Sequence, residues 1–176
     1  MVKTAVIGAG ILGLATALRL QRAGHDVTVF DPAPVSGASY AAAGMLAPVA
    51  EVQFGQDSLL PIMQKALDEY PEFLELLGVP HEAVGYETAG TLLVAADPGD
   101  REHLERMERA YEARGLAFKH LPGSRLTRLE PALAPGLSAG AEIPGDLRID
   151  PRRFTNAMQE ALGPVSYTHL RAHETL

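Results

Sequence analysis

Three glycines near the start of the chain have the spacing of a nucleotide-binding turn. Gly8, Gly10 and Gly13 form the pattern G-x-G-x-x-G, and Asp31 follows 18 residues after the last of them. The first glycine permits a tight turn, the second lets the backbone approach a pyrophosphate, and the third allows close packing of helix and strand. An acid at this distance accepts hydrogen bonds from ribose hydroxyls and repels a 2'-phosphate. The pattern predicts a dinucleotide site; the alternative is that these residues only shape a turn.

The elements around these residues have the order that such a site needs. Residues 3–7 are a short apolar run typical of a strand, and apolar side chains from Ile11 onward recur at helical spacing until Gly24. Residues 27–30 form a second strand-like run, which delivers Asp31 at its carboxyl end. Free amides at the start of the helix would then face the phosphates. We therefore expect an α/β fold with a Rossmann-like, doubly wound domain.

A stretch of small residues, GASYAAAGML at 37–46, follows directly. Small side chains let backbone amides approach a flat ring, where their dipoles stabilise negative charge on a reduced cofactor. By itself the stretch would favour an alanine-rich helix start or a packing turn. Next to the glycine pattern, it favours a flavin contact.

The composition excludes several functional classes. The chain of 176 residues has a formal net charge of -7, which argues against nucleic acid because such binding relies on clustered Lys and Arg. It has no cysteine, so disulfides, thiolate metal sites and a redox dithiol are excluded, and redox chemistry would need a bound cofactor. Glycines interrupt the first apolar run, which argues against a secretory signal, and no stretch has the length of a membrane span. We expect a cytoplasmic protein with no membrane partner.

The later part of the chain alternates helices and strands. Apolar spacing from Ser58 to Leu77 predicts one long helix, bent at Pro71 and ended by Gly78. Strands are expected at 88–96, around Lys119 and at 139–143. Further helices are expected from Asp100, at 124–129, and from Asp150 and Pro151 to Leu162.

Several segments resemble, in order and spacing, the amino-terminal part of the glycine oxidases, which belong to the D-amino-acid oxidase family of FAD-dependent oxidoreductases. The segments are GAGILGLATALRLQRAGHDVTVFD, GASYAAAGMLAPVAE, ETAGTLLVA, LEPAL and GDLRIDPRRF, and the similarity runs from about Lys3 to about Leu162. The small-residue stretch is the most specific of them, because many FAD and NAD proteins share the glycine pattern.

The resemblance implies FAD as the cofactor and a role for three groups of residues. The first loop and helix start would hold the pyrophosphate, the acid and the proline after it would border the adenosine ribose, and the small residues would run beside the ribityl chain and isoalloxazine. These positions are, in chain order, Gly8, Gly10, Ile11, Leu12, Gly13, Asp31, Pro32, Ala38, Ser39, Ala43, Gly44 and Met45. No catalytic residue is predicted in this part of the chain, since little protein acid–base chemistry is expected.

The resemblance also implies a reaction. The family passes hydride from the α-carbon of a small amine or amino acid to FAD, the imine hydrolyses, and oxygen reoxidises the flavin to give hydrogen peroxide. Glycine is the first choice, with a place in thiamine biosynthesis. The alternatives are another family member acting on sarcosine, a D-amino acid or glycerol 3-phosphate, an NAD-binding Rossmann protein, or an inert nucleotide-binding module.

The chain departs from the family towards its carboxyl end. Members are longer, and the arginine and tyrosine that face the substrate lie in their second half. We expect 1–84 and 148–163 to belong to the FAD-binding domain, 85–147 to begin a mixed-sheet α+β substrate domain, and 164–176 to be a non-native tail whose SYTHLRAHET resembles translated adapter sequence. His169 and His173 lie four apart in that tail, but they lack the glutamate of H-E-x-x-H, so no metal site is predicted. The chain alone is expected to be a truncated, inactive fragment, and the full-length protein leaves a homo-oligomer open.

Overall fold

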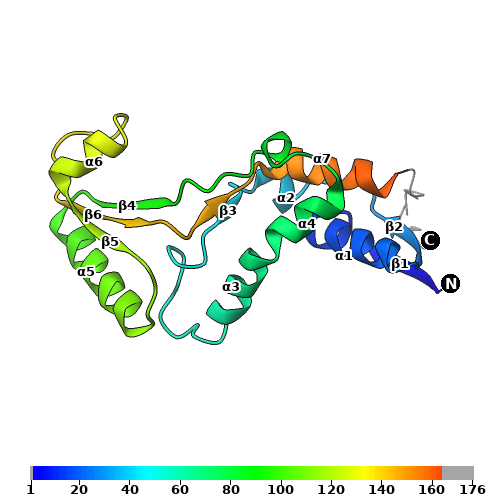
Figure 1. The fold of residues 1–176 in the computed structure, drawn as a ribbon, viewed down its shortest axis with the longest axis horizontal. Coiled ribbons are helices and arrows are strands. Elements are labelled where there is room, and N and C mark those ends of the chain that lie inside the picture. Colours follow the sequence, from blue (N-terminus) through cyan, green and yellow to red (C-terminus); the bar gives the residue numbers. More distant parts are fainter. Residues whose placement is uncertain (1, 164–176) are drawn as a thin grey trace, which may run out of the picture. The chain divides into compact units, whose positions relative to one another are not determined.

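The computed structural model describes residues 2–163, so the predicted non-native tail lies outside the described residues. The chain divides into two compact units (Figure 1). The first comprises the described residues of Met1–Gly44, Pro71–Tyr86 and Ile149–Leu176, and the second comprises Met45–Tyr70 and Glu87–Arg148. Both units mix helices and strands, which agrees with the α/β class expected from the sequence.

The first unit is built on the predicted strand, turn, helix and strand. Strand β1 (Lys3–Ile7) pairs in parallel with β2 (Asp26–Phe30), so that Lys3 lies opposite Asp26 and Ile7 opposite Phe30. Helix α1 (Ile11–Arg22) connects them and buries Leu14, Ala17 and Leu18. The apolar spacing read from the sequence therefore marks the buried face of α1.

Four further helical elements complete this unit. They are α2 (Ala38–Ala41), α4 (Tyr70–Leu77), the 3-10 helix η1 (His81–Val84) and α7 (Pro151–Leu162). Phe73 of α4 packs edge-on against Phe154 of α7, with ring centroids 5.9 Å apart. Asp150 caps α7 as predicted, because its carboxylate accepts the amides of Arg152 at 2.9 Å and Arg153 at 3.0 Å.

The second unit contains an antiparallel sheet in which β6 (Ala139–Ile143) lies between β4 (Thr91–Ala95) and β5 (Lys119–Pro122). A separate short pair joins β3 (Met45–Leu46) to β7 (Leu147–Arg148). The helices are α3 (Leu60–Asp68), α5 (Pro98–Ala113) and α6 (Gly123–Leu129). Its buried apolar side chains form two clusters, one around Tyr111 and Ile143 and one around Ala95 and Leu104.

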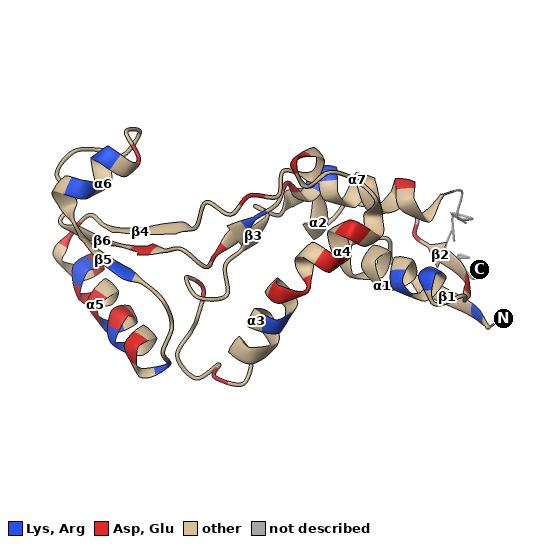
Figure 2. Ribbon diagram, in the orientation of Figure 1, with Lys and Arg blue, Asp and Glu red and all other residues tan. Residues whose placement is uncertain are grey.

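Helix α5 divides into a charged face and an apolar stripe. Figure 2 shows acidic and basic residues following one another along it. Arg101 pairs with Glu105 at 3.5 Å and Arg106 with Glu102 at 3.0 Å, all on exposed side chains. Leu104, Met107, Ala110 and Tyr111 are its buried residues. The charges of α5 are therefore a solvated face that stabilises the helix only slightly.

The prediction of one continuous helix from Ser58 to Leu77 is wrong. The segment forms two helices, α3 and α4, and α3 is followed by Glu69 in the C-cap position. Pro71 explains the break, because proline has no amide to donate to the turn before it and its ring crowds that turn. The start also differs, since Leu59 and not Ser58 takes the N-cap position.

Two other boundaries move by a few residues. The strand expected at 88–96 is limited to Thr91–Ala95. The helix expected from Asp100 begins at Pro98, because Asp97 is the cap and its carboxylate accepts the amide of Asp100 at 2.8 Å. Proline suits the first turn of a helix, where its missing donor costs nothing.

The compact units divide the chain differently from the expected domains, chiefly at residues 45–70, and residues 85–86 and 148 also change sides. Residues 45–70 were expected in the cofactor domain but belong to the second compact unit. Their amides and side chains explain this placement, since β3 pairs with β7 and Leu60 joins the cluster around Tyr111. The functional assignment of the two parts as cofactor and substrate domains stays a prediction.

Within residues 2–163 no helix is both long and apolar enough to cross a membrane.

One buried polar group in the second unit has no hydrogen bond within the described residues. Tyr111 is fully buried, and its hydroxyl oxygen finds no partner there. Burial raises the pKa of Tyr111 to about 12, and the nearby charges of Asp146 and Glu108 contribute in the same direction. The phenol therefore behaves as an apolar group that carries an unsatisfied hydroxyl.

We expect Tyr111→Phe to leave the free energy of unfolding at pH 7 unchanged or raised by up to about 1 kcal/mol, because no hydrogen bond is lost. Above pH 10 the unfolded chain releases the phenol proton first, so the wild type should lose stability between pH 10 and about pH 12 and the variant should lose less. Urea unfolding at pH 7 and across the alkaline range measures both effects. A clear loss of stability at pH 7 would contradict the assignment.

Candidate functional site

The glycine turn between β1 and α1 has the geometry that its residue types predict. Gly8 has a φ of 100°, a region that other residues rarely adopt, and its amide donates to the Phe30 carbonyl at 2.8 Å. A Cβ on Gly13 would overlap the Gly8 carbonyl oxygen. The turn therefore requires glycine at position 8 for its backbone and at position 13 for close packing.

Asp31 lies against this turn. One carboxylate oxygen accepts the amide of Ala9 at 2.6 Å, and the other accepts the amide of Ala33 at 2.7 Å. The sequence predicted a ribose contact for Asp31, with a role in shaping the turn as the alternative, and it did not identify these two amides because they follow from the bend of the chain after β2. Each carboxylate oxygen has a second lone pair, so the acid can hold the turn and still accept from a ligand hydroxyl.

The small-residue stretch is brought to the same turn by one side chain. Ser39, in the short helix α2, accepts the amide of Ile11 at 2.9 Å through its hydroxyl oxygen. A Cβ on Gly10 would lie 3.1 Å from that oxygen, so glycine at this position leaves room for the contact. Residues that are 28 positions apart in the chain thus meet at the start of α1.

The end of the stretch is also fixed by close backbone contact. Gly44 has a φ of 79°, and a Cβ there would overlap the Ile149 carbonyl oxygen. The Ile149 amide donates to the Gly44 carbonyl at 2.9 Å. Met45, the next residue, begins β3 in the second unit and pairs there with Arg148. Ile149 was not among the predicted site residues, because the pairing of β3 with β7, which continues into Gly44 and Ile149, leaves no spacing pattern in the sequence.

The remaining predicted site residues are mostly exposed. Leu12 is 82% exposed and Met45 is 59% exposed, which leaves large apolar side chains uncovered. Pro32, Ala38 and Ala43 are exposed as well, whereas Ile11 is half-buried. Hydrogen bonds and close packing bring together six of the predicted residues: Gly8, Gly10, Ile11, Gly13, Asp31 and Ser39. The exposed Pro32, Ala38 and Ala43 are placed near them by their positions in the chain.

Three arginines near the start of α7 have separate partners. The guanidinium of Arg152 lies over the ring of Tyr40 in α2, 4.5 Å from its centroid. Arg148 donates to Glu87 at 2.6 Å, and Arg153 lies 3.5 Å from Asp150. Because each guanidinium faces a different group, these residues do not form a carboxylate clamp. Arg152 and Tyr40 add a cation–π contact at α2 that the sequence pattern did not reveal.

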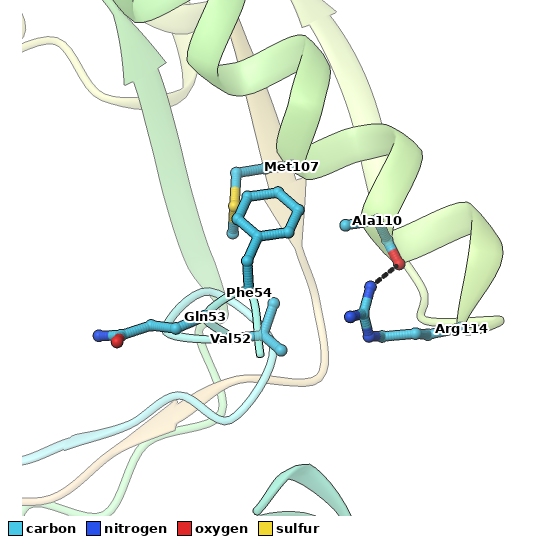
Figure 3. A pocket seen from close by; sticks show the side chains of 6 residues that line it. All are labelled: Val52, Gln53, Phe54, Met107, Ala110 and Arg114. Atoms are coloured by element: carbon cyan, nitrogen blue, oxygen red, sulfur yellow. Dashed lines mark hydrogen bonds between the residues drawn. The ribbon is translucent and has the colours of Figure 1, made fainter. Parts of the chain in front are cut away.

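The second unit has a hollow of its own between the 50–56 segment, α3 and α5. It holds about 630 Å³ and is lined by Ala50, Glu51, Val52, Gln53, Phe54, Gln56, Leu59, Met63, His103 and Met107. Figure 3 shows its neighbour, in which Arg114 donates to the Ala110 carbonyl at 3.0 Å beside Phe54 and Met107. Arg114 also pairs with Asp57. The larger hollow has only Glu51 and His103 as titratable lining residues, and none of the predicted site residues lines it.

Comparison with known proteins identifies the family. The model of the DAO family, described as FAD dependent oxidoreductase, matches residues 3–163. The chain therefore belongs to this family of FAD-dependent oxidoreductases, and the predicted family, α/β fold and cofactor class are confirmed.

Several relatives share the family. The glycine oxidase of Geobacillus kaustophilus is 31% identical over 149 residues, which cover 81% of this chain and 38% of that protein. The uncharacterized oxidoreductase YurR of Bacillus subtilis is 28% identical over 97% of this chain and 46% of that protein. The crystal structure of glycine oxidase from Geobacillus kaustophilus matches with a TM-score of 0.83 at 25% identity, over 96% of this chain and 46% of that one. The chain spans less than half the length of these relatives.

The turn fits FAD by its own geometry. The backbone carries no side chain at Gly8, Gly10 and Gly13, and it leads into helix α1, whose first-turn amides have no acceptor within the helix, as in sites that bind a pyrophosphate. No acidic residue lies in the first turn of α1 to repel an anion. The residues present are therefore suited to the phosphates of the family's cofactor.

Gly13→Ala tests the close approach in this turn. We expect the added methyl group to push α1 from β1 and to lower the free energy of unfolding by about 3 kcal/mol or more, because backbone must move. Gly37→Ala is the matched control, since a Cβ at Gly37 meets nothing within 4 Å, and a change within about 0.5 kcal/mol is expected. Chemical denaturation measures both variants, and equal effects would contradict the packing argument.

Proposed function

We propose that the full-length protein containing this chain is an FAD-dependent oxidase of a small amine or amino acid, with glycine as its first substrate. The contact between Ser39 and Ile11 carries the proposal, because it joins the small-residue stretch to the glycine turn. A nicotinamide-dependent dehydrogenase would use the glycine turn, but it would not explain the small-residue stretch at 37–46. Family membership supports the choice of FAD.

The chain's own residues would hold the cofactor in three places. Gly8, Gly10, Ile11, Leu12 and Gly13 would surround the pyrophosphate, which the amides at the start of α1 attract. The Ser39 hydroxyl accepts the Ile11 amide and keeps its own proton, so it can donate that proton to a phosphate oxygen. Asp31 would accept from the ribose hydroxyls, with Pro32 beside the adenosine.

The last group would line the flavin. Ala38, Ser39, Ala43, Gly44 and Met45 would run along the ribityl chain and the isoalloxazine, where small side chains leave backbone dipoles exposed. When bound, FAD supplies the acceptor for the hydride on the substrate's α-carbon, and oxygen takes up the electrons to give hydrogen peroxide. The protein's part is to orient that carbon and to exclude water from the site.

The substrate class is supported by what the relatives are called. Besides glycine oxidase, a 4-methylaminobutanoate oxidase of Paenarthrobacter nicotinovorans is 26% identical, over 99% of this chain and 21% of that protein. A putative thiamine biosynthesis oxidoreductase of Rhizobium etli is 31% identical over 159 residues. These names favour a small amine or amino acid, and they favour a role in thiamine biosynthesis. A cytoplasmic location and a homo-oligomer of the full-length protein stay predictions.

The full-length protein is expected to purify with the visible absorbance of bound flavin and to form peroxide with glycine. Sarcosine and D-alanine, measured beside glycine, separate the substrates within the family. Residues 1–163 alone are expected to bind FAD weakly and to form no peroxide, since they lack the second half of the relatives. A colourless full-length protein that takes up NADH would overturn the proposal.

Ser39→Ala tests the residue that joins the stretch to the turn. The variant removes the acceptor of the Ile11 amide and the proton offered to phosphate, so we expect FAD to dissociate about tenfold more readily. Ser36→Ala is the control, because the Ser36 hydroxyl donates only to the Ala33 carbonyl, at 2.6 Å, on the exposed side of the same loop. Titration of both apoproteins with FAD gives the comparison. Equal affinities would remove Ser39 from the site.

A further inference from the structure

Asp146 is a buried carboxylate that the proposed function does not yet use. It is fully buried in the second unit, directly before β7. Among the described residues no cation pairs with it. An acid in such a place costs stability unless hydrogen bonds compensate for the lost water. Its presence therefore points to a task that an apolar side chain could not perform.

The carboxylate of Asp146 holds the chain that leaves β3. One oxygen accepts the amide of Val49 at 3.1 Å, and the other accepts the amide of Ala50 at 3.0 Å. These residues begin a turn in which the Glu51 amide donates to the Ala47 carbonyl at 3.0 Å. First-turn amides of this kind lack partners within their own turn, so an acid from elsewhere caps them as an N-cap residue would.

The same acid is tied to β3 through the backbone. In the pairing of β3 with β7, Leu46 lies opposite Leu147 and Met45 opposite Arg148. Asp146 comes directly before β7. Its side chain accepts hydrogen bonds from Val49 and Ala50, which follow shortly after β3. The Asp146 side chain thus adds two hydrogen bonds at one end of the short β3–β7 pair. They join residues that are 97 and 96 positions apart in the sequence.

These donors offset only part of the cost of burying the Asp146 carboxyl, whose pKa is raised above its ordinary value. Burial raises the pKa of the Asp146 carboxyl, whereas hydrogen bonds from the Val49 and Ala50 amides and from the Thr91 side chain lower it. The charge of Asp146 in turn raises the pKa of the nearby Tyr111. Each carboxylate oxygen accepts one of the two amides, so an asparagine, which has an NH2 group in place of one oxygen, would keep only one of these contacts in the same geometry.

We propose that Asp146 is a positioning residue for the flavin site: by holding Val49 and Ala50 it fixes β3 and so the place of Met45. This inference rests on the proposed function, in which Met45 is the last residue of the small-residue stretch beside the flavin. Asp146 itself touches no cofactor. It acts through the β3 backbone, which is why no pattern of nucleotide-binding residues includes it.

The experiment compares Asp146→Asn with Asp68→Asn in the full-length protein. The control makes the same chemical change at an exposed acid of the same unit, at the end of α3. Hydrogen exchange of the Val49 and Ala50 amides is measured first, because it reports the contact whether or not flavin binds. We expect at least one of these amides to exchange about tenfold faster in Asp146→Asn and neither to change in Asp68→Asn.

The second measurement concerns the flavin. We expect FAD to bind about fivefold more weakly to Asp146→Asn, with a shifted flavin reduction potential in the protein that stays folded. A purely structural role would lower the unfolding midpoint and leave the potential unchanged. Asp146→Glu keeps the charge and both acceptor oxygens, so it should restore part of the affinity and keeps the test usable if the amide variant does not fold.

The outcomes separate the two proposals. Faster amide exchange with unchanged affinity and potential would overturn the positioning role and leave the FAD site standing. Unchanged exchange would overturn the contact itself. A wild-type protein that binds no FAD would overturn the proposed function and this inference with it, while the exchange data would still show whether Asp146 holds the turn.

Discussion

The close contact between the Gly8 carbonyl and Gly13 is the constraint on which the proposed site depends. Because Gly13 has no Cβ, α1 can approach the Gly8 carbonyl closely, which is the packing that a pyrophosphate-binding turn requires. Asp31 then reaches the Ala9 amide and Ser39 reaches the Ile11 amide. The contact of Ser39 with Ile11, the first residue of α1, would be lost if α1 were displaced. The glycine turn therefore fixes the positions of Asp31 and Ser39, and it would also position a ligand.

Two acids and one serine accept hydrogen bonds from backbone amides of turns. Asp31 and Ser39 satisfy amides of the glycine turn, and Asp146 satisfies amides of the turn after β3. In each case a side chain far along the sequence accepts a backbone donor that its own turn leaves without a partner. Such contacts fix turns whose backbone donors have no partner within the turn itself. They are the means by which this chain holds small-residue segments in one conformation.

Much of the fold and of the site follows from residue types and spacing. β1, α1, β2, β6 and α7 lie where apolar periodicity, Gly24 and the Asp150–Pro151 start predict them. The helix from Ser58 was predicted as one because its apolar spacing continues through Pro71, and only the break before that proline divides it. For the site, Ala9, Tyr40, Ile149 and Arg152 were missed, since each takes part through a backbone atom or a ring contact that leaves no spacing pattern.

The sequence by itself determined the glycine turn, the acid after the second strand and the family, because these depend on local backbone freedom and on residues at set distances along the chain. Tertiary structure alone decided which distant atoms meet: Ser39 with Ile11, Gly44 with Ile149, and Asp146 with Val49 and Ala50. It also decided that residues 45–70 join the second compact unit. The physical reason is that hydrogen bonds and close packing act between atoms brought together by the fold, and separation along the chain places no limit on them.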